Sequence, residues 1–147
     1  MKKILLCILA LLLSSGAAFA QRGLSCNAIF RGRVISSDRM IRTEVRGSSM
    51  TTYKLDFYRS VQFQVDEKEA LEVAALVKAD ADAAVSAETE VIGKLLTYAL
   101  IQPAQRGKTH RYLCYQARPV GPAWVITILY LEGSATLEDL RSMFDKQ

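Results

Sequence analysis

The chain has 147 residues, of which 50% are hydrophobic and 23% charged, and its formal net charge is +4. This length suits one domain with a buried core. The single histidine excludes zinc sites built on two or more histidines, and the small net charge gives no basis for a general attraction to nucleic acid or to anionic membranes.

Residues 1–20 have the pattern of a secretory signal peptide. Lys2 and Lys3 precede an apolar run, and a small-x-small cleavage site ends at Ala20. The run is shorter than the roughly 20 residues that a membrane-spanning helix needs. We therefore expect cleavage after Ala20, export to the periplasm or the cell envelope, and a single domain over residues 21–147 without a transmembrane segment. Loss of the two lysines halves the net charge.

Two cysteines follow the leader, Cys26 and Cys114, because Cys7 lies within it. An even number of cysteines in an oxidising compartment is consistent with a disulfide. A Cys26–Cys114 bridge would close a long loop and add about 4 kcal/mol on the chain-entropy model. Two alternatives stay open. One has Cys114 as a small buried hydrophobe and Cys26 as a free thiol, and the other has a lipid attached at Cys26.

The first part of the domain has the alternation of apolar and polar residues that is typical of β-strands. It occurs over residues 40–45, 53–57 and 61–65, which gives each segment one buried and one solvent-exposed side. The second and third segments are either two short strands or one strand with a bulge. Before them, residues 26–30 are compatible with one turn of helix.

The apolar period changes from two to about 3.6 at Asp66, where we predict a long helix. Asp66 and Glu69 have the spacing of a capping box, and the buried face that follows is mostly alanine and valine. No glycine or proline interrupts this region before Gly93. Residues 86–90 are interpreted as a polar connection.

Three further strands are predicted over residues 91–101, 109–118 and 124–133. Short loops join them, which favours an antiparallel meander. The last is apolar on both faces, so we expect it to be central in the sheet, with cover on each side. Thr136 and Asp139 then cap a short C-terminal helix. The predicted class is α+β: an antiparallel sheet of about five strands with one long helix and one short C-terminal helix packed on it.

The sequence contains no recognisable catalytic constellation. Motifs for a serine nucleophile elbow, a calcium loop and a phosphate-binding glycine loop are all absent. His110 and Cys114 lie four residues apart on a predicted strand, which is too far for a hydrogen bond. We therefore assign no catalytic, cofactor-binding or metal-binding residue. The alternative is a small envelope hydrolase with an unrecognised site that uses Asp56, Glu88, Glu90 or His110.

Arginines are concentrated over residues 31–59 of the domain. They are Arg31, Arg33, Arg39, Arg42, Arg46 and Arg59. Arginine forms bidentate contacts with carboxylates and phosphates. Arg42 and Arg46 lie on the polar side of one predicted strand with Tyr58 nearby in sequence, and these three residues form a candidate patch for an envelope protein or glycan partner. The alternative is a charged sheet edge that prevents aggregation between strands.

Several segments resemble small exported Gram-negative bacterial proteins known only as a domain of unknown function. They are Tyr-Lys-Leu at 53–55, Phe-Tyr-Arg-Ser at 57–60, Arg-Tyr-Leu-Cys-Tyr at 111–115, and Leu-Glu-Gly at 131–133 followed by Thr-Leu-Glu-Asp-Leu at 136–140. The resemblance implies an envelope location and a helix-and-sheet domain, and it carries over no catalytic residue, cofactor or substrate. We therefore expect a non-catalytic binding or structural module of the cell envelope.

Overall fold

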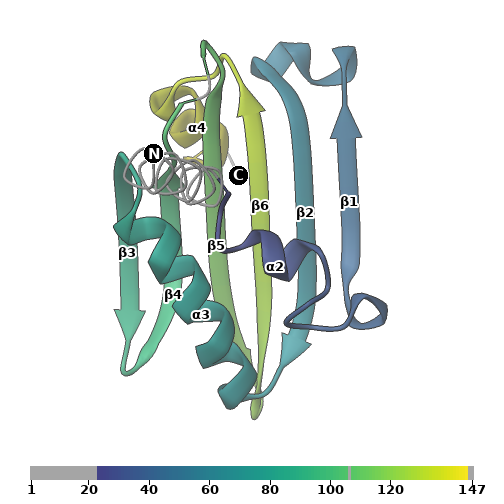
Figure 1. Cartoon of the computed structure of the whole chain (residues 1–147), viewed down its shortest axis with the longest axis vertical. Coiled ribbons are helices and arrows are strands. Elements are labelled where there is room, and N and C mark those ends of the chain that lie inside the picture. The colour runs from purple at the N-terminus through teal and green to yellow at the C-terminus, as the bar shows by residue number, and fades with distance from the viewer. Residues whose placement is uncertain (1–22, 106, 146–147) are drawn as a thin grey trace, which may run out of the picture.

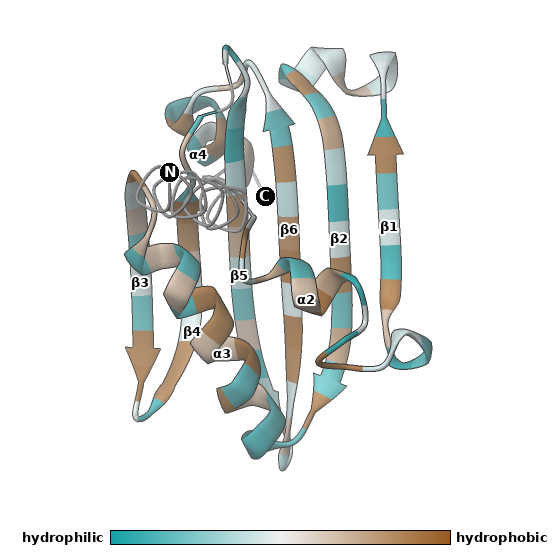
Figure 2. Ribbon diagram, in the orientation of Figure 1, coloured by the Kyte–Doolittle hydropathy of each residue, from teal (hydrophilic) through white to brown (hydrophobic). Residues whose placement is uncertain are grey.

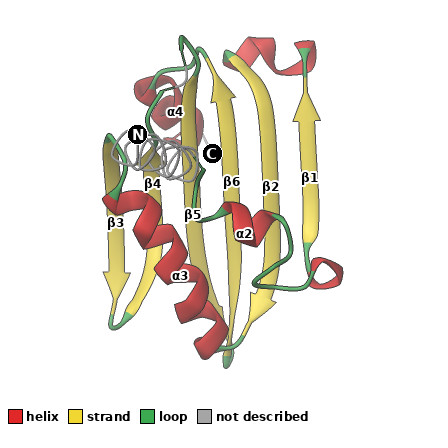
Figure 3. Ribbon diagram, in the orientation of Figure 1, coloured by secondary structure: helices red, strands yellow, loops and turns green. Residues whose placement is uncertain are grey.

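The protein forms a six-stranded antiparallel sheet with helices on both faces (Figure 1). The computed structural model describes residues 23–105 and 107–145, so the predicted leader, with its cleavage site at Ala20, lies outside the described residues. Figure 3 shows the sheet as one continuous layer. Its strands are β1 (Ile41–Arg46), β2 (Leu55–Val65), β3 (Ser86–Ile92), β4 (Leu95–Gln102), β5 (His110–Val120) and β6 (Ala123–Gly133). The helices are α2 (Asn27–Phe30), α3 (Glu67–Asp82) and α4 (Leu137–Asp145), with 3-10 turns at Ser37–Arg39 and Ser48–Tyr53.

The predicted α+β class is confirmed, and the sheet has one strand more than predicted. The additional strand is β3, which occupies residues 86–90, interpreted as a polar connection, and also the first two residues of the predicted strand 91–101. The rest of that predicted strand belongs to β4, after a turn at residues 93–94. Strand β3 lies at the edge of the sheet, pairs with β4 alone, and exposes almost every side chain. An edge strand of this kind is held by backbone hydrogen bonds to its neighbour, so its side chains carry no alternating hydrophobic signal.

Strand β6 lies at the centre of the sheet, as its sequence predicts. The strand order is β1-β2-β6-β5-β4-β3, and β6 pairs with both β2 and β5 over nearly its full length. Ile126 and Ile128 are fully buried on one face, and Leu131 is buried on the other. Val125 and Leu129 on that second face are only partly buried. The expected cover on both faces is therefore complete on one face and partial on the other.

Helices α2 and α3 cover one face of the sheet, which we call the helix face. Helix α3 begins with the predicted capping box, in which the Glu69 N–H donates to Asp66 Oδ1 at 2.8 Å and the Asp66 N–H donates to Glu69 Oε1 at 3.3 Å. Small residues on its buried side, such as Ala70 and Ala74, let the helix approach β4 closely. The buried core lies between α3 and the central strands. Along the edge strand β1, by contrast, hydrophobic and hydrophilic residues alternate (Figure 2).

Helix α4 packs on the opposite face, at one end of the sheet. The predicted Thr136–Asp139 cap is present: the Thr136 N–H donates to Asp139 Oδ2 at 2.9 Å and the Asp139 N–H donates to Thr136 Oγ1 at 3.1 Å. Leu140 from this helix is buried against Tyr112 and Leu131. The Tyr112 hydroxyl donates to the carbonyl of the residue before the cap at 2.6 Å, so the start of α4 is fixed to β5.

The two cysteines are free thiols, and the disulfide considered from the sequence is not formed. Cys26 is fully buried in the core of the helix face, whereas Cys114 packs with the cluster on the opposite face, so the sheet separates them. The alternative with a free thiol at Cys26 agrees with this, but the burial is the reverse of what it expected: Cys26 is fully buried and Cys114 is only partly buried. Burial raises the pKa of both thiols, that of Cys114 to about 12, which keeps them protonated at neutral pH.

Gly133, at the end of β6, is fixed by the close approach of β2. A Cβ atom at this position would lie 2.3 Å from the Lys54 carbonyl oxygen and 2.7 Å from the Leu55 Cα. That carbonyl accepts a hydrogen bond from the Ala135 N–H at 3.0 Å, so it is not free to move. Only glycine fits here without displacing the backbone.

We therefore predict that Gly133→Ala lowers the free energy of unfolding by about 1–3 kcal/mol, the usual cost of overpacking. Urea denaturation followed by circular dichroism measures this change. Ser134→Ala, at the exposed neighbouring position, is the matched control and should unfold like the parent protein. Equal midpoints for the Gly133→Ala variant and the parent would show that β2 can move away at no cost.

Candidate functional site

The chain just before helix α2 is attached to helix α3 by a buried carboxylate. Asp80, in the last turn of α3, accepts hydrogen bonds from the Ser25 N–H at 2.6 Å and the Cys26 N–H at 2.9 Å. These two N–H groups lie just before α2, and the side chains of Ile29 and Phe30 bury the helix against the helix face. The carboxylate thus fixes the position of the segment that carries Arg31.

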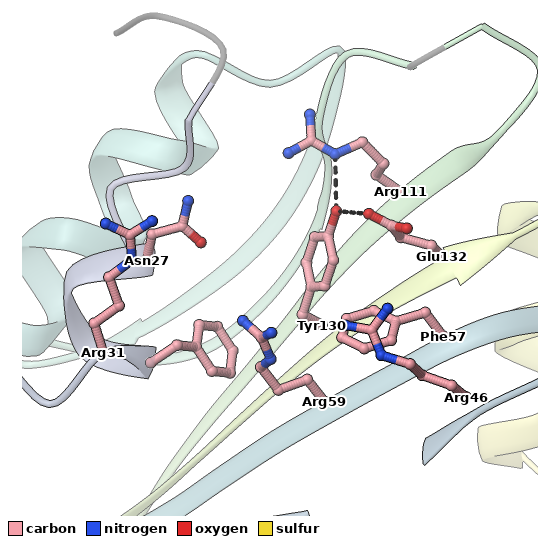
Figure 4. A pocket seen from close by; sticks show the side chains of 9 residues that line it. Asn27, Arg31, Arg46, Phe57, Arg59, Arg111, Tyr130 and Glu132 are labelled. Carbon is pink, nitrogen blue, oxygen red and sulfur yellow. Dashed lines mark hydrogen bonds between the residues drawn. The ribbon is translucent and has the colours of Figure 1, made fainter. Parts of the chain in front are cut away.

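A recess of about 350 Å³ lies between α2 and the sheet on the helix face. Figure 4 shows Asn27 and Arg31 on one side of it, Arg111 and Tyr130 on the other, and the Arg59 guanidinium between them. Sheet register explains the arrangement, since neighbouring strands contribute side chains in phase on this face. The complete lining is Asn27, Phe30, Arg31, Arg46, Phe57, Arg59, Arg111, Tyr130 and Glu132. We call it the arginine recess.

Arg111 is the most unusual residue of the arginine recess, because its side chain is buried without a charged partner. It is 6% exposed. Its Nε donates to the Tyr130 hydroxyl at 3.0 Å and its Nη1 donates to the Ala104 carbonyl at 3.3 Å. Within the described part of the chain it forms no ion pair with a carboxylate. Buried charges in proteins are normally paired, so this guanidinium is available to an anion.

Glu132 and Arg111 are direct register partners on β6 and β5, yet Tyr130 stands between their charged groups. The Tyr130 hydroxyl accepts from Arg111 and donates to Glu132 Oε1 (Figure 4). Burial raises the pKa of Tyr130, the hydrogen bond to Glu132 adds to this increase, and Arg111 opposes it. The hydroxyl therefore keeps its proton and separates a guanidinium from a carboxylate.

The remaining wall of the arginine recess combines aromatic rings with two further arginines. The Arg46 guanidinium lies 4.5 Å from the ring centroid of Phe57, and that of Arg59 lies 5.2 Å from the same centroid. Glu44 contacts both arginines, with N–O distances of 3.1 Å to Arg46 and 3.4 Å to Arg59. One carboxylate shared between two guanidinium groups leaves this wall with a net positive charge. Cation–π attraction to the Phe57 ring favours these positions of the two guanidinium groups.

A second, adjoining hollow extends the basic surface toward β1. It shares Phe30, Arg31 and Arg59 with the arginine recess, and adds Arg42. Arg42 Nη2 donates to the Phe30 carbonyl and to Ser37 Oγ, each at 2.9 Å. Arg42 therefore connects β1 to the chain after α2, which is a structural contact rather than an open ligand contact.

The three residues of the predicted partner patch do not come together. Arg46 lines the arginine recess and Arg42 lines the adjoining hollow, both on the helix face. Tyr58 lies on the opposite face, where it lines an apolar groove of about 610 Å³ beside Leu129 and Met143. Directly paired residues of neighbouring strands point to the same face of a sheet. Tyr58 pairs with Val45, whose side chain points to the face opposite that of Arg42 and Arg46.

The residues considered for hydrolysis are also dispersed. Glu88 and Glu90 lie on edge strand β3, Asp56 on β2 and His110 on β5. No two of these three strands are neighbours in the sheet. Glu88 forms an ion pair with Arg141 of α4. His110 stacks on Tyr112 with ring centroids 6.3 Å apart. Residues 23–105 and 107–145 contain no cluster of three or more His, Cys, Asp or Glu side chains arranged to hold a metal ion.

Three important residues of the arginine recess were missed by sequence reasoning: Arg111, Tyr130 and Glu132. Arg111 is in phase with Leu113 and Tyr115 on the buried side of β5. A charged residue at an otherwise apolar position of a strand therefore marked Arg111 as a candidate site residue in the sequence itself. The partners of Arg111 could not be found in the same way, because they depend on which strand lies beside β5.

The fold and the arginine recess together define an α+β domain with a basic, partly aromatic recess on the helix face of its sheet. The chain belongs to a family of unknown function (DUF6108), whose model matches residues 13–144. No curated protein and no solved structure matches it. Among the described residues, no helix is both long enough and apolar enough to span a membrane.

The attachment of α2 leads to a prediction about Asp80. In Asp80→Asn the amide can accept one of the two N–H groups but presents its own NH2 to the other. We expect the free energy of unfolding to fall by about 1–3 kcal/mol. Hydrogen exchange of the Ser25 and Cys26 amides should also accelerate relative to amides in the central strands. Both quantities can be measured on the same protein, by urea denaturation and by exchange with NMR detection.

Asp82→Asn is the matched control for this experiment. Asp82 lies on the same helix, is exposed, and forms an ion pair with Lys78 at 2.9 Å. A surface pair of this kind contributes little to stability. If both variants behaved alike, the Asp80 carboxylate would not be what holds α2.

Proposed function

We propose that this protein is an exported, non-catalytic binding module of the cell envelope that holds an anionic group of its ligand in the arginine recess. The observation that carries the proposal is the buried Arg111 guanidinium, whose partners among residues 23–105 and 107–145 are all neutral. A carboxylate or phosphate in the recess would provide the missing counter-charge. The ligand belongs to an envelope protein or glycan partner.

The charge balance of the two adjoining hollows supports an anionic ligand. Their linings contain five arginines and two carboxylates: Arg31, Arg42, Arg46, Arg59 and Arg111 against Glu44 and Glu132. The Arg31 side chain has no hydrogen bond or ion pair to any other residue that the structure describes, and only its backbone N–H is bonded, to the Asn27 carbonyl. A cleft lined mainly by one sign of charge raises the local concentration of the opposite ion. Arg31 and Arg59 would form the outer contacts and Arg111 the inner one.

The location in the envelope rests on the leader pattern. Residues 1–20 combine a charged start, a short apolar run and a small-x-small site at Ala20, which together direct secretion and cleavage. Free, protonated thiols are compatible with an oxidising compartment when they are kept apart and buried. The sheet keeps Cys26 and Cys114 apart, and Cys26 is fully buried while Cys114 is partly buried.

We predict that the protein purified from its host has an intact mass that begins at Gln21. Alkylation without a reductant should modify Cys26 and Cys114 only after denaturation, because their raised pKa values suppress the reactive thiolate. A mass that begins at Met1 would contradict export by this leader. A lipidated mass that begins at Cys26 would instead show a membrane-anchored lipoprotein.

We predict that inorganic phosphate and ethyl phosphate bind the arginine recess, and that Arg31→Gln and Arg59→Gln each weaken this binding about tenfold, as expected for loss of one charge-assisted contact. Titration of the 15N-labelled protein should shift the Nε–Hε signal of Arg111. Higher salt should weaken the affinity, because the contact is electrostatic.

Arg33→Gln is the control for these variants. Arg33 is an exposed arginine two positions from Arg31, and it does not line either hollow. Its replacement removes the same net charge and should leave the affinity within about twofold. If Arg33→Gln weakened binding as much as Arg31→Gln, the attraction would be a general charge effect and the recess would not be the site. No saturable shift at Arg111 would overturn the proposal altogether.

A further inference from the structure

We infer that the arginine recess selects a zwitterionic ligand, one that carries an ammonium group close to its anionic group. This inference rests on the proposed function and adds the class of ligand. The anion would lie among Arg31, Arg59 and Arg111, and the ammonium would contact Glu132.

The arrangement of Arg111 and Glu132 is the main reason. They face each other across two paired strands, and a direct ion pair would neutralise both charges. The Tyr130 hydroxyl instead bonds to each of them and keeps them separate. The recess therefore offers a positive and a negative group side by side, both available to a ligand (Figure 4).

The hydrogen bonds of Glu132 leave room for such a contact. Tyr130 bonds to Oε1, and within the described residues Glu132 forms no ion pair with a lysine or an arginine. A carboxylate in a recess with so many arginines would repel a simple anion and reduce its affinity. The same carboxylate strengthens binding when the ligand brings a positive charge, so Glu132 works as a specificity-determining residue.

The size of the recess limits the ligand to a small group. Its volume of about 350 Å³ is at the lower end of the range for ligand pockets. The aromatic surface of Phe57, Tyr130 and Phe30 suits the short aliphatic segment that links the two charges. The same chemistry is present in a phosphoethanolamine group and in an amino acid with free amine and carboxylate, so the test includes both.

The test compares two matched pairs of probes by NMR titration of the protein lacking residues 1–20. O-phosphoethanolamine is compared with ethyl phosphate, and β-alanine with propionate; within each pair only the ammonium differs. We expect the parent protein to prefer the zwitterion of at least one pair by about tenfold. In Glu132→Gln this preference should fall to about one, while the ammonium-free probe binds as tightly as before or more tightly.

The control is Glu67→Gln, at the exposed first position of α3 and outside the recess lining. It removes the same charge and should retain the preference. A preference in the phosphate pair alone would identify a phosphoethanolamine-type ligand, and one in the carboxylate pair alone an amino acid. Equal binding within both pairs, or a preference that survives in Glu132→Gln, would overturn this inference and leave the anion site standing. Absence of binding by all four probes would overturn both.

Discussion

The structure depends on the pairing of β6 with β2 on one side and β5 on the other. This double pairing places Ile126 and Ile128 at the middle of the core and fixes which side chains of three strands share a face. The arginine recess follows from the same register, because Phe57 and Arg59 on β2, Tyr130 and Glu132 on β6, and Arg111 on β5 point to one side. A slip of one residue in either pairing would move these groups to opposite faces.

The carboxylate of Asp80 positions helix α2 over the sheet. The sheet supplies the floor of the recess, and α2 supplies one wall only because Ser25 and Cys26 are fixed to α3. An acidic residue in the last turn of a helix opposes the helix dipole, which favours positive charge there. The contact with the chain before α2 explains why Asp80 is buried at this position. The carboxylate lowers the local stability of α3 but provides a tertiary connection.

Sequence reasoning recovered what local periodicity and capping chemistry determine. The long helix with its Asp66–Glu69 box, the Thr136–Asp139 cap and the central position of residues 124–133 are all confirmed. Strand β3 was missed because it is held by backbone pairing with β4, and its own side chains have no strand-like hydrophobic pattern. The site was found only in part, since Arg46 was named but Arg111, Tyr130 and Glu132 were not. Their proximity depends on the order of strands in space, which a single sequence does not reveal.

The pairing of β2 with β6 also has a consequence for how the chain folds. These strands are neighbours in space, but α3 and three other strands separate them in sequence. Contacts between such distant segments form slowly, because a large loop must close first. A chain that is made from its N-terminus presents β1 and β2 long before β6 is available. The floor of the arginine recess is therefore completed by the last strand of the sheet, and partly folded intermediates without β6 would contain its arginines but not the recess itself.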